Sequence, residues 1–398
     1  MKDHRQLGRE MDLFMFSELA PGSPIWLPNG NIVYSLLQEK IRKLQEKTYH
    51  EVRTPVLWKS ELYKKSGHLE HYAKNMFFSG EEYALKPMNC PGHMEIFKSK
   101  GWSIRDLPYR ISDFGTLHRN EPSGALGGLT RCVAFCQDDA HIFLALDQIE
   151  EEVSSLIGLI NKVYYAFKMD LRVALSTRPD NFLGEKGVWD TAETLLKNAL
   201  KDFEESPKDG AFYGPKIDFF VKDNLGREWQ TATIQLDFQL PQRFELEYTD
   251  HDNNRKTPVV IHRAIFGSFE RLIGILLEHF QGNLPFWLSL VQVAILPVSD
   301  KHLDYAFTVK KRLLDIRTMV DDSNNRLSQK VAIAQSKHVN IMAIVGNKEI
   351  PSAEEYRNAE DFRQPLGRVS VRMPNGQTDS MEWLDFYKKC SELNRFEF

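Results

Sequence analysis

The sequence predicts an α+β domain on a mostly antiparallel sheet, followed by a smaller α/β domain with a mixed sheet. Up to about residue 280, β-prone segments come in runs with amphipathic helical segments between them. The turn-forming segment Gly282-Asn283-Leu284-Pro285 marks a boundary. Beyond it, strand and helix patterns alternate over about 110 residues, as in α/β proteins. We therefore expect a first domain at 1–285 and a second at 286–398.

The composition is that of an ordinary globular protein, with 42% hydrophobic and 27% charged residues among 398. No apolar run approaches the roughly 18 residues that span a bilayer, so we expect no membrane contact. The net charge of −4 does not indicate a broad basic surface for nucleic acid, although a chain with this net charge can still carry local basic patches. Four cysteines are too few for a disulfide framework in so long a chain, which favours a reducing compartment.

Apolar spacing predicts the elements of the first domain. Expected strands are 26–28, 50–57, 77–78, 83–85, 171–176, 210–221, 230–238 and 258–261. Expected helices are 37–47, 149–164, 188–203 and 267–279, with an arm or helix at 1–12 and turns at 21–24 and 29–31. Pro55 interrupts the strand 50–57, and proline within a strand indicates an edge or an interface. His68 lies in a polar loop and is expected to be exposed.

The segment Phe114–Phe143 is predicted to be a hairpin with a long glycine-rich loop and polar groups on both arms. Arg119 on the first arm is a fixed cation that can hold a phosphate bidentately. Glu121 lies two residues on, so on a strand it shares a face with Arg119 and can accept from a nucleotide amine. The alternative is a surface Arg–Glu pair.

Residues 230–238 alternate between an apolar and a polar face. The polar face (Thr233, Gln235, Asp237) lines a cleft in one interpretation and faces solvent in the other. Arg271 lies about one turn into the helix 267–279, where its charge supplements the positive end of the helix dipole.

In the second domain, strands are expected at 291–296, 317–320, 340–345 and 368–373, and helices at 303–315, 328–337 and 381–393. The polar segment 352–364 is expected to be an exposed insertion.

Cys90, His141 and His262 are candidate metal ligands, since each ends a predicted strand or begins a turn. They are far apart in the sequence, so their spacing is no evidence, and each alone is more often structural. Together they would give three ligands and one open position, the arrangement of catalytic zinc. Cys132 and Cys136 have no matching pair elsewhere, so we reject them as a metal site.

Several segments of the chain resemble the motifs of a known enzyme family. Arg119-Asn-Glu121 with its loop resembles motif 2 of class II aminoacyl-tRNA synthetases, Gly267–Arg271 resembles motif 3, and the Pro55 strand resembles motif 1. The segments KPMNCPGH, HRNEPSG, QDDAHIF, GAFYGPKI, QLDF and IHRAIFGS are similar to the threonyl-tRNA synthetases in particular. The resemblance covers the chain from Asp3 to about Met381.

The resemblance implies ATP-dependent ligation of L-threonine to tRNA(Thr) through a threonyl-adenylate. One Zn²⁺ per chain, on Cys90, His141 and His262, would select the threonine hydroxyl, and Mg²⁺ would accompany ATP. Catalytic roles fall on Arg119, Lys216 and His68. ATP-binding roles fall on Arg119, Glu121, Arg131, Phe135, Gln230, Thr233 and Arg271. Threonine-binding roles fall on Met88, Gln137, Asp139, Tyr213, Gln235 and Ser268.

The second domain resembles the anticodon-binding domain shared with the prolyl, histidyl and glycyl enzymes. Asn324, Glu349 and Arg372 match positions that read anticodon bases. The Pro55 strand implies a homodimer.

Two departures from the family stand out. Motif 2 usually reads Arg-Val-Arg-Gly-Phe-Thr, whereas here Arg131 is followed by Cys-Val-Ala-Phe-Cys, which affects the loop that touches the tRNA acceptor end. The chain also begins where the family's catalytic domain begins, without the usual editing domains, although a piece of a longer enzyme would begin there as well. We therefore expect measurable serine activation and no correction of Ser-tRNA in cis. Short fungal mitochondrial enzymes are similar, so we expect a mitochondrial matrix location, with the cytoplasm as the alternative.

Two other functions are compatible with the sequence. A related synthetase, prolyl or seryl, is a first alternative, and the Cys–His–His set argues against prolyl. A synthetase-like RNA-binding protein without catalysis is a second, which the altered motif 2 loop permits.

Overall fold

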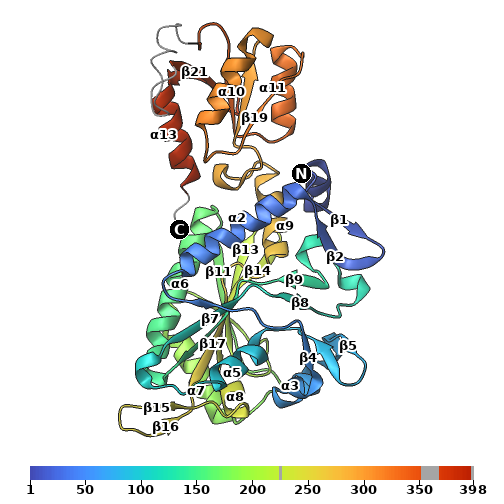
Figure 1. The fold of residues 1–398 in the computed structure, drawn as a ribbon. Coiled ribbons are helices and arrows are strands. Elements are labelled where there is room, and N and C mark those ends of the chain that lie inside the picture. The colour runs from blue at the N-terminus through green and yellow to red at the C-terminus, as the bar shows by residue number, and fades with distance from the viewer. Residues whose placement is uncertain (224–225, 351–366, 396–398) are drawn as a thin grey trace. The chain divides into compact units, whose positions relative to one another are not determined.

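The computed structural model describes residues 1–223, 226–350 and 367–395, which form two compact units (Figure 1). One unit comprises residues 14–25 and 37–275, and the other comprises residues 1–13, 26–36 and the described residues from 276 onward. The expected α+β architecture followed by an α/β architecture is confirmed. No helix in the described ranges is long and apolar enough to cross a membrane.

An eight-stranded sheet is the centre of the larger unit. Its strands, in spatial order, are β12 (Glu204–Ser206), β11 (Leu171–Ser176), β13 (Lys216–Lys222), β14 (Glu228–Asp237), β17 (Val259–Ala264), β10 (Asp139–Leu144), β7 (Tyr109–Asp113) and β3 (His50–Glu51). Only the outermost pairs, β11 with β12 and β3 with β7, are parallel. The sheet is therefore mostly antiparallel, as the sequence predicted.

Two short helices cover one face of this sheet. Helix α5 (Cys90–Lys98) and helix α8 (Gln239–Arg243) bury Met94, Phe97 and Leu240 against Phe143 of β10 and Val260 of β17. Side chains alternate along a strand, so this is also the face on which His141 and His262 lie. The core thus brings the first residue of α5, Cys90, to the two histidines.

The other elements of this unit are shorter or flank the sheet. Helices α6 (Ile149–Ala166) and α7 (Lys186–Asn198) pack against β14. Helices α3 (Ser60–Lys65) and α4 (His68–His71) also lie in this unit, as do the last nine residues of α2 (Pro28–Gln45) and the first part of α9 (Phe269–Phe280). Small sheets pair β1 (Phe14–Ser17) with β2 (Ala20–Trp26), β4 (Leu57–Lys59) with β6 (Tyr83–Leu85) and β5 (Phe78–Ser79), β8 (Thr116–His118) with β9 (Ala134–Cys136), and β15 (Tyr248–Thr249) with β16 (Arg255–Lys256).

Three expectations for the first 60 residues were wrong. Residues 21–24 belong to β2, because the hairpin turns earlier, at Glu18-Leu19. Residues 29–31 lie in the first turn of α2 (Pro28–Gln45), and a Cβ on Gly30 would lie 1.9 Å from the carbonyl oxygen of Leu13. That glycine therefore permits a close approach and makes no turn. The expected strand 50–57 is divided between the two residues of β3 and Leu57 at the start of β4, and Pro55 lies between them outside any strand.

The second unit contains a five-stranded mixed sheet in the order β19 (Thr318–Val320), β18 (Val293–Pro297), β20 (Ile341–Val345), β21 (Arg368–Arg372) and β22 (Thr378–Glu382). Strand β18 is parallel to both of its neighbours, and the other pairs are antiparallel. Helices α10 (Leu303–Arg312) and α13 (Trp383–Asn394) share a core with one face, and α11 (Leu327–Ser336) shares one with the other. Helix α1 (His4–Glu10) also belongs to this unit.

The expected elements of this unit are present, with one addition. Strand β22 was missed because its sequence TDSME lacks apolar alternation and lies almost entirely exposed. The predicted insertion 352–364 lies outside the described residues.

Candidate active site

Three neighbouring strands place polar side chains in one row across the large sheet. His262 on β17 lies opposite His141 on β10 and opposite Gln235 on β14, both in antiparallel register. Asp139 and Thr233 lie two residues along their strands and so project from the same face.

These side chains line a cavity of about 280 Å³. The interpretation that Thr233 and Gln235 line a cleft is therefore confirmed. The predicted site residues in its wall are Met88, Cys90, Arg119, Gln137, Asp139, His141, Tyr213, Thr233, Gln235 and His262, and the others are Tyr72, Ala211, Phe212, Arg263 and Ala264.

Cys90, His141 and His262 converge at this wall, with their ligand atoms all within 4.8 Å of one another. All three residues are buried. His141 Nε2 lies 2.8 Å from His262 Nδ1. One thiol and two imidazoles are donors that zinc accepts, so these three residues would fit a zinc ion with three protein ligands.

Burial governs the protonation of this group. It raises the pKa of the Cys90 thiol well above its usual range, with the neighbouring Asp139 and Asp237 charges adding to the effect. Burial likewise lowers the pKa of His141 well below its usual range. Neutral imidazole keeps the lone pair that a metal requires.

His68 is buried, so the expectation that it is exposed was wrong. Its Nδ1 hydrogen-bonds to Ser66 Oγ at 2.7 Å, and its Nε2 lies 3.4 Å from Met88 Sδ and 3.9 Å from Cys90 Sγ. Burial lowers the pKa of His68 to about 3, with nearby His262 and Arg119 adding to the effect. Its neutral ring lies at the metal-ligand group and does not face solvent.

Three arginines gather beside the cavity. The guanidinium of Arg271 donates to the carbonyls of Thr130 and Gln230 at 2.9 and 3.1 Å. Burial, and then the charges of Arg119 and Arg131, lower the pKa of Arg271. An anionic ligand would relieve this repulsion, so the cluster suits a phosphate.

Glu121 does not share a strand face with Arg119, because β8 ends at His118 and the chain turns there. The amide of Glu121 donates to the carbonyl of Arg119 at 2.8 Å. The Glu121 carboxylate instead pairs with Arg131 at 2.7 Å. The Arg119 guanidinium lies 5.0 Å over the ring of Phe135.

Asp218 on β13 contacts three of the predicted residues, one on its own strand and two on the neighbouring strand β14. It forms an ion pair with Lys216 and accepts hydrogen bonds from Gln230 Nε2 at 2.6 Å and Thr233 Oγ1 at 3.2 Å. Tyr213 donates to Gln235 Oε1 at 2.6 Å and stacks on His262. Gln137 and Ser268 are bridged through their backbones.

Comparisons with known proteins decide the family. The model of the tRNA synthetase class II core domain (G, H, P, S and T) matches residues 77–280. Threonine--tRNA ligase 2 of Bacillus subtilis is 48% identical over 373 residues, which cover 91% of this chain. A crystal structure described as the RNA binding domain of threonyl-tRNA synthetase from Cryptosporidium parvum is 40% identical, with a TM-score of 0.91, and covers 100% of this chain and 99% of that one.

The chain belongs to the threonyl-tRNA synthetase family.

The coverage of the relatives and a more distant structure show how far these similarities extend. The chain spans 58% of the length of the Bacillus relative. Prolyl-tRNA synthetase from Cryptosporidium parvum is only 16% identical, with a TM-score of 0.72 over 98% of this chain and 74% of that one, so it shares the fold alone.

The anticodon binding domain model matches residues 292–372 of this family member. Glu349 accepts from Ser370 Oγ on β21 at 2.6 Å, and Arg372 ends the same strand. Asn324 lies exposed in the loop between β19 and α11, at the opposite side of the sheet order from β21 and β22. Of the three predicted residues, only Arg372 is in the sheet, and the other two lie in connections between its elements.

Sequence reasoning did not assign Asp218, Asp237, His93 or Arg263 to the site. Asp237 was placed on the polar face of its strand, but its partner, His262 Nε2 at 2.8 Å, is remote in the sequence. His93 follows Cys90 at i+3, so the two lie on one side of α5, and this spacing was the available signal. Nothing local marks Asp218 or Arg263.

Proposed function

We propose that the chain catalyses ATP-dependent ligation of L-threonine to tRNA(Thr), through a threonyl-adenylate. The observation that carries the proposal is the buried Cys90–His141–His262 group, which lines the same cavity as Arg119. A metal group and a phosphate-binding cation at one cavity suit the joining of a hydroxyl amino acid to a nucleotide.

The cavity wall suits threonine. Cys90, His141 and His262 would hold a zinc ion, which would serve as a Lewis acid that recognises the amino and hydroxyl groups of the substrate. Asp139, held by Asn89 Nδ2 at 3.0 Å, accepts a hydrogen bond from the substrate hydroxyl. The Tyr213–Gln235 hydrogen bond fixes one side of the pocket. Met88, Gln137 and Ser268 complete the proposed threonine site.

The arginine cluster suits ATP with Mg²⁺. Arg119 and Lys216 hold the α-phosphate region, where charge develops as the threonine carboxylate attacks, and Arg271 holds the outer phosphate. Glu121 accepts from the adenine amine, and Phe135 stacks on the ring. Arg131, Gln230 and Thr233 complete the proposed ATP site.

Transfer to tRNA involves the remaining predicted residues. We assign residues 1–285 to a catalytic domain and residues 286–398 to an anticodon-binding domain in which Asn324, Glu349 and Arg372 contact bases. His68 assists transfer of threonine to the tRNA ribose, and its place beside Cys90 and Met88 supports this role. The proposed homodimer uses the short edge strand β3 and the Pro55 segment after it.

The test is amino-acid-dependent ATP–pyrophosphate exchange on protein of measured metal content, with threonine, serine, valine and proline. We expect exchange with threonine, weaker exchange with serine, and one zinc per chain. Arg119→Ala should lower exchange by about 10²–10³-fold, the usual loss for a group that stabilises transition-state charge.

Arg172→Ala is the matched control, because Arg172 pairs with Glu204 and Glu228 on the surface of β11. It should exchange like the parent. Exchange with proline in place of threonine would move the assignment to a related synthetase. Absence of exchange with every amino acid, in folded zinc-loaded protein, would leave an RNA-binding relative without catalysis.

A further inference from the structure

Each imidazole of the metal-ligand group uses its second nitrogen in a hydrogen bond. His262 Nε2 lies 2.8 Å from Asp237 Oδ2. The other oxygen of Asp237 accepts from the backbone amides of Gln239 and Leu240 at 2.7 and 3.0 Å, which fixes the carboxylate. Asp237 therefore holds the proton of His262 on Nε2 and leaves the Nδ1 lone pair for a metal.

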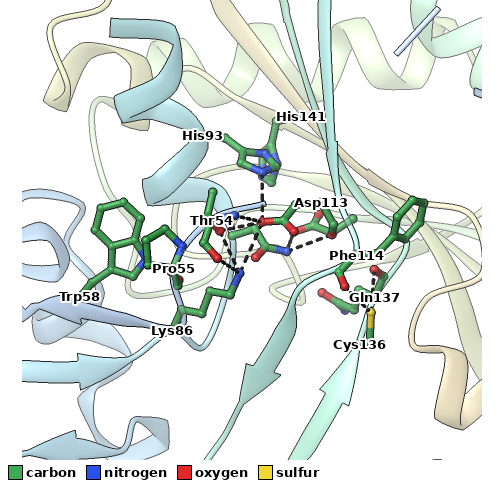
Figure 2. Close-up of polar contacts among 12 residues, drawn as sticks. Thr54, Pro55, Trp58, Lys86, His93, Asp113, Phe114, Cys136, Gln137 and His141 are labelled. Atoms are coloured by element: carbon green, nitrogen blue, oxygen red, sulfur yellow. Dashed lines mark hydrogen bonds and ion pairs between the residues drawn. The ribbon is translucent and has the colours of Figure 1, made fainter. Parts of the chain in front are cut away.

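His141 has an unusual second partner, another imidazole. Its Nδ1 lies 2.8 Å from His93 Nδ1, and the two rings meet edge to face (Figure 2). His93 is fully buried on α5. Two neutral imidazoles in this contact share one proton, so one nitrogen donates and the other accepts. If His141 binds a metal through Nε2, its Nδ1 must donate, and His93 Nδ1 must accept.

The far side of His93 faces a carboxylate. His93 Nε2 lies 3.8 Å from Asp113 Oδ2, and among the described residues it has no hydrogen-bond partner (Figure 2). A neutral His93 that accepts at Nδ1 carries its proton on Nε2, which is the nitrogen beside the anion. The Asp113 charge favours this tautomer.

Asp113 is itself anchored as an anion. Its Oδ2 accepts from the Thr54 amide at 3.1 Å and from the Thr54 hydroxyl at 2.6 Å, and it lies 3.4 Å from the buried ammonium of Lys86 (Figure 2). Burial alone would raise the pKa of Asp113, but the neighbouring His93, the hydrogen bonds from Thr54 and the Lys86 charge lower it to about 2.

We propose that His93 is a positioning residue that sets the tautomer of His141 for metal binding, and that Asp113 orients His93. This inference rests on the proposed metal centre. Asp113 and His93 orient His141, and Asp237 orients His262. The ring nitrogens that remain, His141 Nε2 and His262 Nδ1, then face one point beside Cys90 Sγ.

The first experiment measures Zn²⁺ affinity of the full chain by competition with a chelating dye. His93→Leu removes the acceptor and should weaken affinity by about 10–100-fold, as loss of an outer partner of a ligand histidine does. His93→Asn places an amide oxygen near the position of Nδ1 and should restore affinity to within about threefold of the parent. The Co²⁺ absorption spectrum of His93→Leu should also change, since His141 then lacks its orienting partner.

His118→Leu is the matched control, because His118 is also partly buried and its Nδ1 lacks a hydrogen-bond partner among the described residues. It should bind zinc like the parent. Parent protein that binds no zinc would overturn the proposed metal centre. If the parent protein binds zinc and His93→Leu has the same zinc affinity and the same Co²⁺ spectrum, the positioning role of His93 alone would be overturned.

A second experiment needs no variant and so does not depend on folding of His93→Leu. Selective ¹⁵N labelling of histidine in the zinc-loaded parent reports which ring nitrogens carry protons. We expect His93 protonated on Nε2 and His141 on Nδ1. A proton on His93 Nδ1 would contradict the proposal directly.

Discussion

Lys86 and Asp113 form an ion pair with side chains only 1% exposed. The pKa of Asp113 is about 2 in the folded chain, whereas the pKa of an aspartate in an unfolded chain is 3.8. Because the folded pKa is lowered, the group stabilises the fold fully above about pH 4, and this stabilisation is lost as the pH falls toward 2. It amounts to about 2 kcal/mol.

Asp113→Asn should remove this pH-dependent contribution. We expect the difference in unfolding free energy between parent and variant to narrow as the pH falls from 5 to 3, measured by denaturant titration at each pH. A difference that stays constant over this range would show that Asp113 does not carry the acid sensitivity.

Single residues also mark the limits of prediction from sequence. Cys90, His141 and His262 were chosen for their chemistry and their places at element ends, and they do converge. His68 was expected in solvent because its neighbours in sequence are polar, yet Met88 and Cys90 cover it. The contacts of His93 with His141 and Asp113 could not be predicted, because they depend on how α5 packs against β10 and β7.

At the level of elements, the loop that carries Tyr213 is fitted tightly to β14. A Cβ on Gly214 would lie 1.9 Å from the carbonyl oxygen of Leu236. Gly214→Ala should therefore push the loop off the strand and displace Tyr213 from His262. We expect a stability loss of about 1–3 kcal/mol and a raised KM for threonine in the exchange assay.

Gly158→Ala provides the comparison, because a Cβ at Gly158 in α6 meets nothing within 4 Å. A gain of about 0.5–1 kcal/mol is expected there, with exchange unchanged. Equal KM values for threonine in the two variants would refute the role assigned to the loop.

Elements with strong periodicity were predicted well, and those defined by distant contacts were not. Strand β11 was predicted at the observed bounds, and the polar face of β14 lines the cavity. Helix α2 begins nine residues before the predicted start. The prediction was late because Gly30 is typical of a turn, and its close approach to Leu13 is not evident from the sequence. The register between β10 and β17, which aligns the two histidines, is a tertiary property that local sequence does not encode.

For the molecule as a whole, the proposed site predicts an order of amino-acid selection. Serine keeps the hydroxyl and lacks one methyl group, so its kcat/KM should fall only about 10–200-fold below that of threonine. Valine lacks the hydroxyl and leaves polar groups unpaired, so it should fall about 10⁴-fold or more. Pyrophosphate exchange with the three amino acids measures both ratios.

In the proposed site, zinc selects for the hydroxyl group, so a chelator that removes zinc should abolish the preference for threonine and serine over valine. Added Zn²⁺ should restore threonine exchange. Valine activated as well as serine by zinc-loaded protein would be incompatible with the proposed site.

The row of His141, His262 and Gln235 has a consequence for synthesis of the protein. Cys90 leaves the ribosome early and His262 much later, so a nascent chain cannot assemble the ligand group until most of the large sheet exists. Pairings between segments so distant in sequence form slowly. Zinc binding at the proposed metal centre would then show that the strands of this sheet have paired in the correct register, and refolding experiments should detect it as a late event.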